Sequence, residues 1–243
     1  MKQPVFCTAG DTAALRYARN ILQQWGYAVS DAPCAGATHL LLPVPSFEAD
    51  GALKGGPRLE DVLSTLPEDV MVLGGNLPSL PCQGIDFLQD DFYLAENAAI
   101  TAQCTMKLIP LHRNGIEGAS VLIIGWGRIG KRLAPLLKAS GAKVTAAARK
   151  PSDLAAASDL GYAVVETQKW DAAQYDIVIN TAPAPLMDQQ ETRTDALLID
   201  LASVKGITGS RVIWARGLPN KDAPDASGVL IAKTALRYAL GKE

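Results

Sequence analysis

The sequence predicts an α/β protein of two domains, each with a parallel sheet, and three observations lead to this prediction. Short apolar runs alternate with amphipathic helical stretches along the whole chain, which is typical of parallel sheets covered by helices. A length of 243 residues with 48% hydrophobic content is sufficient for two cores. A Gly-x-Gly-x-x-Gly motif at 125–130 stands between an apolar run and a helical stretch. Together they predict two Rossmann-like domains.

Residues 1–96 form the predicted N-terminal α/β domain, on the substrate side. A helix capped by Asp11 and Thr12 is expected to run to Trp25, because its apolar residues recur at helical spacing. Residues 47–58 are rich in Gly, Pro and charge, which predicts a loop at the carboxyl ends of the strands, where open α/β sheets place ligands. The strands of this domain are expected at 5–7, 27–29, 39–44 and 70–73.

Residues 97–117 are predicted to connect the domains, with a glycine-free helical stretch that ends near Pro110. The second domain is expected at 118–220, and residues 221–243 form a C-terminal helix for which the N-terminal domain is a candidate packing partner. The strands of the second domain are expected at 121–124, 143–147, 162–165, 176–180, 197–201 and 212–214. The helices of this half are expected at 128–140, from 152, and at 223–240.

The glycine motif predicts a phosphate-binding turn. Gly125 permits the sharp turn out of the strand, Gly127 has no Cβ and so allows close approach of a pyrophosphate, and Gly130 lets the helix pack closely on the strand. The helix N-terminus adds N–H groups and a positive dipole end. The C-terminal domain is therefore predicted to be a dinucleotide-binding Rossmann fold, with an empty Rossmann-like unit as the alternative.

The residues that end the next strand indicate which dinucleotide binds. An NAD site places Asp or Glu there, but this chain has Arg149 and Lys150, followed by the hydroxyl of Ser152. A guanidinium pairs with a 2′-phosphate. We therefore expect NADP(H) as the preferred cofactor and NAD(H) as the alternative, with solvated charges as the simpler explanation of the two cations.

Two further strand ends supply candidates for the cofactor and for the substrate cleft. Residues 180–183, Asn-Thr-Ala-Pro, follow a buried strand and are expected to pass the nicotinamide ribose, unless they only form a turn. Asp200 is expected to be a hydrogen-bonded structural carboxylate, whereas Ser203 and Lys205 beyond it are cleft candidates; a plain surface lysine is the alternative. The expected cofactor contacts are Gly125, Trp126, Gly127, Arg128, Ile129, Gly130, Arg149, Lys150, Ser152, Asn180, Thr181, Ala182, Pro183 and Ala202.

Asn97 and Thr101 are spaced i and i+4 on the connecting helix, so they share one face. Both are expected to face the substrate cleft; a helix cap and a buried hydroxyl bonded to the backbone are the equally favoured alternative.

Charge and rare residues exclude several classes of function. The net charge of −2 does not indicate a nucleic-acid partner. Residues 1–117 carry 7 Lys and Arg against 13 Asp and Glu, whereas 118–243 carry 16 against 12, so the half with the glycine motif is the basic one. His39 and His112 are the only histidines and neither lies in the second half, which excludes the His-dependent D-2-hydroxyacid dehydrogenases. No triad or metal-ligand spacing is present, so no metal is expected.

Four cysteines without paired spacing are expected to be reduced thiols in the cytoplasm. The first residues lack an apolar leader segment and no apolar run approaches the length of a membrane span, so no membrane partner is expected.

Several motifs in a fixed order resemble the family formed by the A subunits of dipicolinate synthase. They are Val-Leu-Ile-Ile-Gly-Trp-Gly-Arg-Ile-Gly, Ala-Ala-Ala-Arg-Lys, Asp-Ile-Val-Ile-Asn-Thr-Ala-Pro, Leu-Ile-Asp-Leu-Ala-Ser and Arg-Gly-Leu-Pro, with looser agreement in Thr-His-Leu-Leu-Leu-Pro-Val and Asn-Ala-Ala-Ile-Thr in the first half. The resemblance covers nearly the whole chain. More distantly, the chain is similar to D-2-hydroxyacid dehydrogenases and adenosylhomocysteinase, which share the cofactor domain.

The resemblance implies NADP-dependent oxidation of a cyclic hydroxytetrahydrodipicolinate to pyridine-2,6-dicarboxylate, the dipicolinate of sporulation, together with a flavoprotein-like B subunit. The family motif Asn-Ser-Ile-Pro-Thr-x-Glu-Gly maps onto 97–104, where Asn97 and Thr101 are kept and Gln103 replaces the carboxylate. The catalytic candidates, which would meet a small dicarboxylate substrate, are Asn97, Thr101, Gln103, Ser203 and Lys205. Two alternatives stay open: an oxidoreductase for another small cyclic or imino acid, and a dinucleotide-binding protein that is inactive without its partner. A homo-oligomer is also left open.

Overall fold

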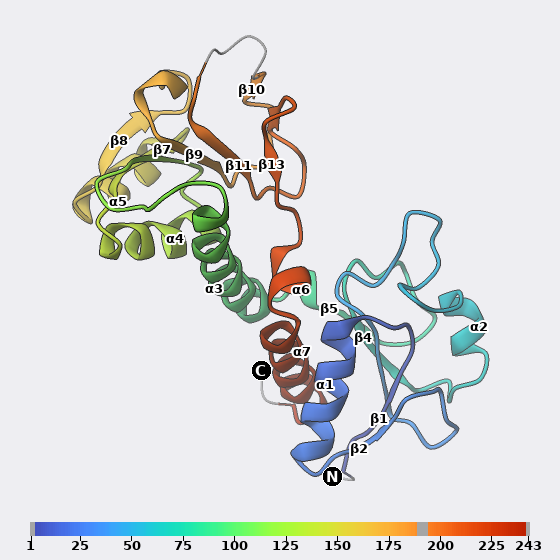
Figure 1. Cartoon of the computed structure of the whole chain (residues 1–243). Helices are drawn as coiled ribbons and strands as arrows, with labels where there is room; N and C mark the ends of the chain where they lie inside the picture. Colours follow the sequence, from blue (N-terminus) through green and yellow to red (C-terminus); the bar gives the residue numbers. More distant parts are fainter. Residues whose placement is uncertain (1–2, 189–193, 242–243) are drawn as a thin grey trace. The chain divides into compact units, whose positions relative to one another are not determined.

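The structure is a computed structural model that describes residues 3–188 and 194–241. It divides into two compact units, one formed by the chain up to Asn97 together with the segment from Ala223, and one formed by Ala98–Asp222 (Figure 1). Each unit has its own parallel sheet with helices along the chain between the strands. The predicted fold class, two Rossmann-like α/β domains, is confirmed.

The first unit contains a five-stranded sheet in the order β2-β1-β3-β4-β5, with all pairs parallel. This is the flavodoxin-like order. The strands are β1 (Val5–Thr8), β2 (Ala28–Ser30), β3 (His39–Leu41), β4 (Met71–Gly74) and β5 (Gly84–Asp86). The sequence did not predict β5, because its three residues are half-buried or exposed and show no apolar pattern.

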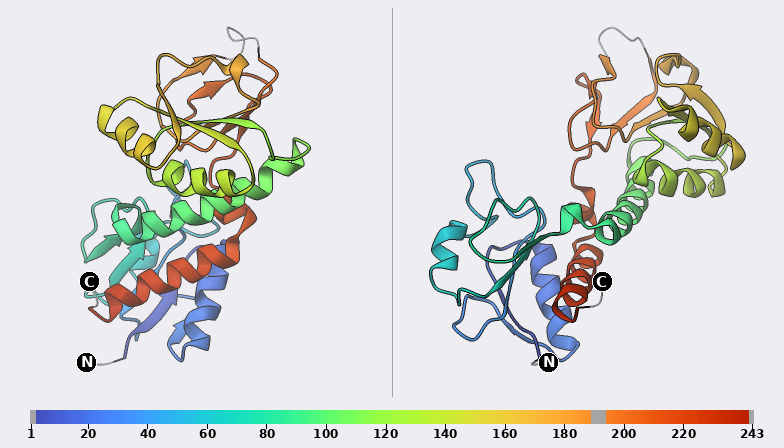
Figure 2. Two further views of the ribbon diagram at one scale, coloured as in Figure 1. Left: turned by 90° about the vertical axis from the view of Figure 1, so that its left-hand side faces the viewer. Right: turned by 180° about the vertical axis from the view of Figure 1, so that it is seen from behind.

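Helices from both ends of the chain pack together in the first unit. Helix α1 (Ala13–Gln24) begins after Thr12, whose hydroxyl accepts from the Leu15 N–H at 3.2 Å. It lies beside α7 (Pro224–Ala239), as the views of Figure 2 show. A short helix α2 (Leu59–Leu63) contributes Leu59 and Val62 to a core with Leu40 and Val72 of the sheet.

Helix α3 (Asp91–Leu108) begins six residues before its predicted start at 97 and ends before 117. The early start has a local cause, because the Asp90 carboxylate accepts from the Tyr93 N–H at 2.6 Å and so caps the first turn. Short 3-10 turns precede and follow the helix at Phe87–Gln89 and Ile109–Leu111.

The second unit contains a six-stranded parallel sheet in the order β13-β11-β9-β6-β7-β8. The strands are β6 (Ser120–Ile124), β7 (Lys143–Ala148), β8 (Ala163–Glu166), β9 (Ile177–Asn180), β11 (Leu197–Asp200) and β13 (Ile213–Trp214). Two crossover helices, α4 (Arg128–Ala139) and α5 (Pro151–Asp159), lie on one side of the sheet (Figure 1).

The opposite face of this sheet is covered by irregular segments. Its core consists of Leu122, Ile124, Ala147, Ala172, Val178, Leu198 and Ile207. Ala172 comes from a 3-10 turn at Ala172–Gln174, and Ile207 from a two-stranded parallel ladder of β10 (Met187–Asp188) and β12 (Ile207–Thr208). A short helix α6 (Leu218–Asp222) ends the unit. Among the described residues, no helix has the length and hydropathy needed to cross a membrane.

Candidate functional site

The candidate site lies at the carboxyl edge of the second unit's sheet. Because all six strands are parallel, the segments that follow them meet at this edge. Strand β6 is followed in one direction by β7 and β8, and in the other by β9, β11 and β13. The strand order therefore reverses between β6 and β9, which is where doubly wound folds bind dinucleotides.

The three glycines of the turn after β6 have different surroundings. Gly125 adopts a φ of +102°, and a Cβ there would lie 2.6 Å from the Thr181 hydroxyl oxygen. A Cβ at Gly130 would lie 2.2 Å from the carbonyl oxygen of Gly125. A Cβ at Gly127 would meet no atom of the described residues within 4 Å, and its φ of −89° suits any residue. The protein itself thus requires Gly125 and Gly130, whereas at Gly127 it leaves open space in front of the turn.

Helix α4 starts directly behind this open space. Its N-cap is Gly127, which has no side chain to bond the N–H groups of the first turn, and Arg128 is its exposed first residue. The N-terminus of the helix and its dipole thus face the space that a Cβ of residue 127 would enter. These features fit a pyrophosphate group.

Trp126 and Thr181 bind the protein rather than pointing into the open space. Trp126 is only 4% exposed and packs edge-on against Tyr162, with ring centroids 5.4 Å apart. The Thr181 hydroxyl lies 3.0 Å from the carbonyl oxygen of Ile124 and 3.1 Å from that of Gly125. The loop after β9 is thereby joined to the glycine turn.

A buried carboxylate connects the loops that follow β9 and β11. Asp200 is fully buried and accepts from the side-chain amide of Asn180 at 3.0 Å and from the Ala202 N–H at 2.9 Å. Its other oxygen accepts from the N–H groups of Gly206 at 2.7 Å and Ile207 at 2.8 Å. Asp200 is the hydrogen-bonded structural carboxylate that the sequence predicted, and it fixes the course of residues 201–207.

The Asn180 side chain is also fully buried, and its bonds stay within this network. Its oxygen accepts from the Ala182 N–H at 2.8 Å and its nitrogen donates to the Ala182 carbonyl at 3.0 Å. Asn180 therefore shapes residues 181–183 from below, while Pro183 at their end is exposed.

The cations predicted to read a 2′-phosphate lie at the end of β7. Arg149, Lys150 and Ser152 are all exposed, and α5 begins at Pro151 between them. Within the described residues, neither Arg149 nor Lys150 forms an ion pair with a carboxylate. The positive charge at this end of the edge is thus available to an anion.

The predicted substrate-side residues differ in exposure. Ser203 is exposed and Lys205 half-buried on the loop after β11. On α3, Asn97 is half-buried and is the last residue of the first unit, while Thr101 is 6% exposed and belongs to the second. Gln103 is exposed, since two residues along a helix turn the side chain to another side. The structure thus brings Ser203 and Lys205 to the carboxyl edge but does not group Gln103 with Thr101.

Other ionisable groups have structural surroundings. His39 lies in β3 with its Nδ1 2.7 Å from the Thr38 hydroxyl, and burial lowers its pKa, so the ring is neutral at pH 7. All four cysteines are thiols rather than disulfides, and burial raises the pKa of Cys7 to about 11, which keeps its thiol protonated. The described residues include no group of His, Cys, Asp or Glu suited to a metal ion.

Comparison with known proteins agrees with the geometry of the second unit. Residues 97–198 match the family model "D-isomer specific 2-hydroxyacid dehydrogenase, NAD binding domain". No curated protein matches the sequence. Among solved structures, the chain is similar to the A subunit of dipicolinate synthase from Bacillus halodurans, with a TM-score of 0.83 and 23% identity over 98% of this chain and 97% of that one.

Two further structures show how widely the fold is shared. The A chain of dipicolinate synthase from Bacillus subtilis gives a TM-score of 0.80 at 21% identity, over 100% of this chain and 98% of that one. D-Lactate dehydrogenase from Salmonella gives 0.67 at 13% identity, over 99% and 98%.

The fold, the glycine turn and the family model define the class of the protein, an NAD(P)-dependent oxidoreductase with a Rossmann cofactor domain. Within this class, the chain is similar in fold to the A subunit of dipicolinate synthase over nearly its whole length, as its motifs predicted. The match to the hydroxyacid dehydrogenases concerns their cofactor domain, because the late histidine that their reaction requires is absent from this sequence.

Proposed function

We propose that this protein is an NADP(H)-dependent oxidoreductase that converts a cyclic hydroxytetrahydrodipicolinate to pyridine-2,6-dicarboxylate. The observation that carries the proposal is the carboxyl edge of the second unit, where open space at Gly127 lies between the end of β6 and α4, and the exposed cations Arg149 and Lys150 follow β7. The similarity to the A subunits of dipicolinate synthase supports the choice of substrate. The overall change removes water, a hydride and a proton from the ring.

The residues of this edge have separate tasks in the proposed reaction. The turn at 125–130 binds the pyrophosphate through its N–H groups, and Arg149, Lys150 and Ser152 bind the 2′-phosphate of the adenosine half. Bound NADP⁺ supplies the hydride acceptor. The adenosine lies toward β7, so the nicotinamide half lies toward β9 and β11.

The loops after β9 and β11 then orient the nicotinamide and the substrate. The Asp200 network fixes these loops before the ligands bind, so their ordering does not have to be achieved during binding. Residues 181–183 and Ala202 form the wall beside the nicotinamide. Ser203 and Lys205 bind a substrate carboxylate, and Asn97, Thr101 and Gln103 are the further candidates for its polar groups.

Steady-state absorbance at 340 nm tests the proposal directly. The full chain is mixed with hydroxytetrahydrodipicolinate and NADP⁺ or NAD⁺, with and without the B subunit, and the ring product is identified by chromatography. We expect NADPH to form together with pyridine-2,6-dicarboxylate. Absence of both products in every mixture, from protein shown to bind NADPH, would exclude this function.

An oxidoreductase for another small cyclic or imino acid is the second candidate. It is favoured by Gln103, an exposed amide where the dipicolinate synthase motif has a carboxylate. In the same assay, a panel of cyclic imino acids and hydroxy acids distinguishes the two. Turnover of a panel member with a higher kcat/KM than hydroxytetrahydrodipicolinate would assign the second function.

We also propose that the chain works with a B-type partner in the cytoplasm. The similar structures are each one chain of a synthase with more than one kind of chain, which supports the partner, and the four cysteine thiols support the compartment. Turnover that increases on addition of the B subunit, and co-elution of the two chains, are the expected results. Full turnover by the chain alone would contradict the need for a partner.

A further inference from the structure

The edge strand β13 ends in two large side chains that the roles described above do not use. Trp214 is 44% exposed, and Arg216 two residues later is exposed as well. The guanidinium carbon of Arg216 lies 6.0 Å from the centre of the Trp214 ring, which is cation–π distance. The indole N–H donates to the Ala202 carbonyl at 3.3 Å. An exposed tryptophan is therefore attached to the loop after β11.

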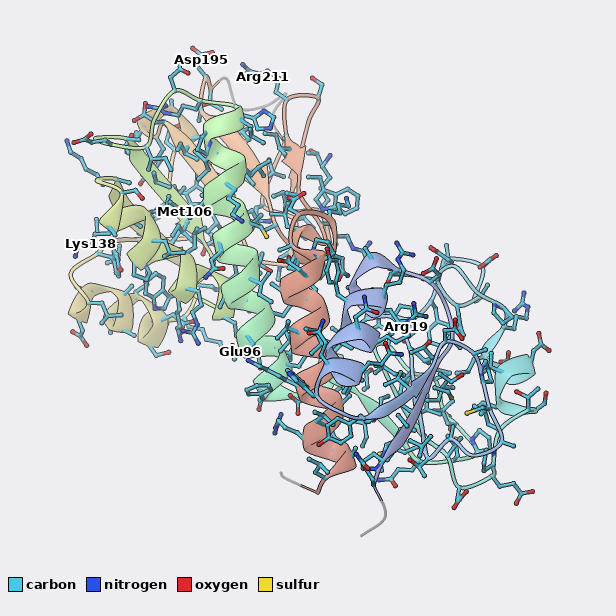
Figure 3. The ribbon with its side chains drawn as sticks, turned by 60° about the horizontal axis from the view of Figure 1, so that its bottom comes forward. Arg19, Glu96, Met106, Lys138, Asp195 and Arg211 are labelled. Carbon is cyan, nitrogen blue, oxygen red and sulfur yellow. The ribbon has the colours of Figure 1, made fainter. Side chains whose placement is uncertain are left out.

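This position is on the nicotinamide side of the carboxyl edge. Strand β13 pairs with β11, with Trp214 opposite Asp200, and the Ala215 N–H donates to the Asp200 carbonyl at 2.8 Å. The amino ends of the same two strands are marked by Asp195 and Arg211, labelled in Figure 3, whose side chains pair at 3.7 Å. Trp214 and Arg216 thus lie at the opposite ends of these strands from that ion pair.

The surface around Trp214 combines apolar area with positive charge. Val204, on the same loop as Ala202, is 57% exposed, and Lys205 follows it. Within the described residues, neither Arg216 nor Lys205 forms an ion pair. A flat indole face beside such a planar guanidinium suits a flat ring that carries a carboxylate, because the ring can stack while the carboxylate accepts two N–H bonds.

We propose that Trp214 and Arg216 form the surface that recognises the ring substrate. The Trp214 indole packs against the face of the ring, the Arg216 guanidinium pairs with one ring carboxylate, and Lys205 is placed to attract the second. The choice of a ring dicarboxylate rests on the proposed function. The two side chains act in binding, so they set KM more than kcat.

Calorimetry on the full chain saturated with NADP⁺ tests this recognition, with pyridine-2,6-dicarboxylate and benzene-1,3-dicarboxylate as probes. We expect Arg216→Met to raise the Kd for both probes about tenfold or more, since a hydrogen-bonded charge pair contributes roughly 1.5–3 kcal/mol. Trp214→Leu is expected to raise it several-fold, and Arg216→Lys to restore part of the affinity. Arg211→Met is the matched control, because it removes the same charge at the amino end of the same strand.

The outcomes separate recognition from a structural role and from the proposed reaction. A raised Kd for the probes with unchanged NADP⁺ affinity and unchanged Tm supports the proposal, as does a raised KM with kcat preserved. Wild-type affinity for the probes in Arg216→Met and Trp214→Leu, or no probe binding by the wild type, overturns it. Probe binding that depends on Arg216 without turnover of hydroxytetrahydrodipicolinate would leave the recognition surface standing and refute only the proposed reaction.

Discussion

Gly127 and Gly130 belong to one motif, but substitution at each is restricted by different surroundings. A Cβ at residue 130 meets the chain itself, at 2.2 Å from the Gly125 carbonyl, whereas a Cβ at residue 127 meets no atom of the described residues. Gly130 therefore serves the packing of α4 on the turn, and Gly127 serves the approach of a ligand. This difference cannot be read from the motif, in which all three positions are simply glycine.

Alanine at the two positions should consequently give opposite results. Gly127→Ala is expected to leave Tm unchanged and to weaken NADPH binding about tenfold or more, because the methyl group occupies the space of the pyrophosphate. Gly130→Ala is expected to lower the free energy of unfolding by about 1–3 kcal/mol, since the turn must shift. Thermal unfolding and fluorescence titration with NADPH measure the two effects. Equal loss of stability in both variants would contradict the assignment.

Arg149 is the residue expected to distinguish NADP(H) from NAD(H). Arg149→Asp replaces attraction of the 2′-phosphate by repulsion, so the Kd for NADPH should rise by about tenfold or more while that for NADH falls or stays constant. Lys143→Asp, at the exposed amino end of the same strand, is the matched control for net charge. Calorimetry with both cofactors checks the result, and unchanged affinity for both would exclude Arg149 as the phosphate reader.

At the scale of elements, the loops after β9 and β11 depend on one carboxylate. Asp200 accepts four hydrogen bonds, two on each oxygen, from Asn180 and from three backbone N–H groups. Because Asp200 has no exposed surface, water cannot replace a lost acceptor. The loops with the nicotinamide wall and the substrate candidates are thus coupled through the sheet's carboxyl edge.

Asp200→Asn tests this coupling with almost no change in volume. Whichever way the amide is turned, an NH₂ group faces backbone or side-chain N–H groups, so we expect a loss of about 1–3 kcal/mol in the free energy of unfolding. The Kd for NADPH and the KM for the substrate should both rise. Asp195→Asn, which is exposed at the amino end of β11, is the control and should behave as wild type. Wild-type kinetics in Asp200→Asn would show that the loops do not need the network.

How far the elements could be predicted depended on where their determinants lie. The strand, turn and helix at 120–139 could be predicted because their signals are local: a buried apolar run, three glycines and an amphipathic helix. The start of α3 was missed since it depends on the Asp90 cap, and β5 was missed because its edge position leaves no apolar pattern. Trp214 could not be connected with Ala202 from sequence, because only the order of β11 and β13 in the sheet brings them together.

At the scale of the whole chain, the first unit is completed by the C-terminal helix. Asp90, just before α3, accepts from the Tyr238 hydroxyl at 2.6 Å and from Arg237 at 3.3 Å, and both donors lie on α7. Arg237 also lies over the ring of Phe92 at 4.5 Å. The end of the chain is thus attached to a segment that lies 148 positions earlier, counted from Asp90 to Tyr238.

This attachment should depend on pH. Burial alone would raise the pKa of the Asp90 carboxyl, but the hydrogen bonds from Tyr238 and Tyr93 and the charge of Arg237 outweigh burial and lower it. The folded protein therefore binds this proton at lower pH than the unfolded chain does. The stabilisation is complete above the ordinary Asp pKa of about 3.9 and is lost as the pH falls through the folded value.

Urea unfolding between pH 7 and pH 3 measures this dependence. We expect wild type to exceed Asp90→Asn in free energy of unfolding at pH 7, and the difference to shrink once the pH falls below about 4. Asp69→Asn, an exposed carboxyl of the same unit, should show no such difference. A constant difference across the whole range would mean that the Asp90 charge does not contribute.

The composition of the two units also predicts how the molecule unfolds. The first unit needs both chain ends, and its helices α1 and α7 approach so closely that a Cβ at Gly228 would lie 2.4 Å from the Cβ of Tyr17. The second unit is a single continuous segment that carries the dinucleotide turn. Substitution at the helix contact and binding of the cofactor should therefore act on different units.

Differential scanning calorimetry of the full chain can separate the two. We expect two transitions, of which Gly228→Ala lowers one, because α7 must move away from α1, whereas Lys233→Ala on the exposed side of α7 lowers neither. NADPH at 100 times its Kd stabilises the unit that binds it by about 2.7 kcal/mol and should raise only the other transition. If Gly228→Ala and NADPH shift the same transition, the two units unfold together, and the first unit's helix contact then contributes to the stability of the cofactor site.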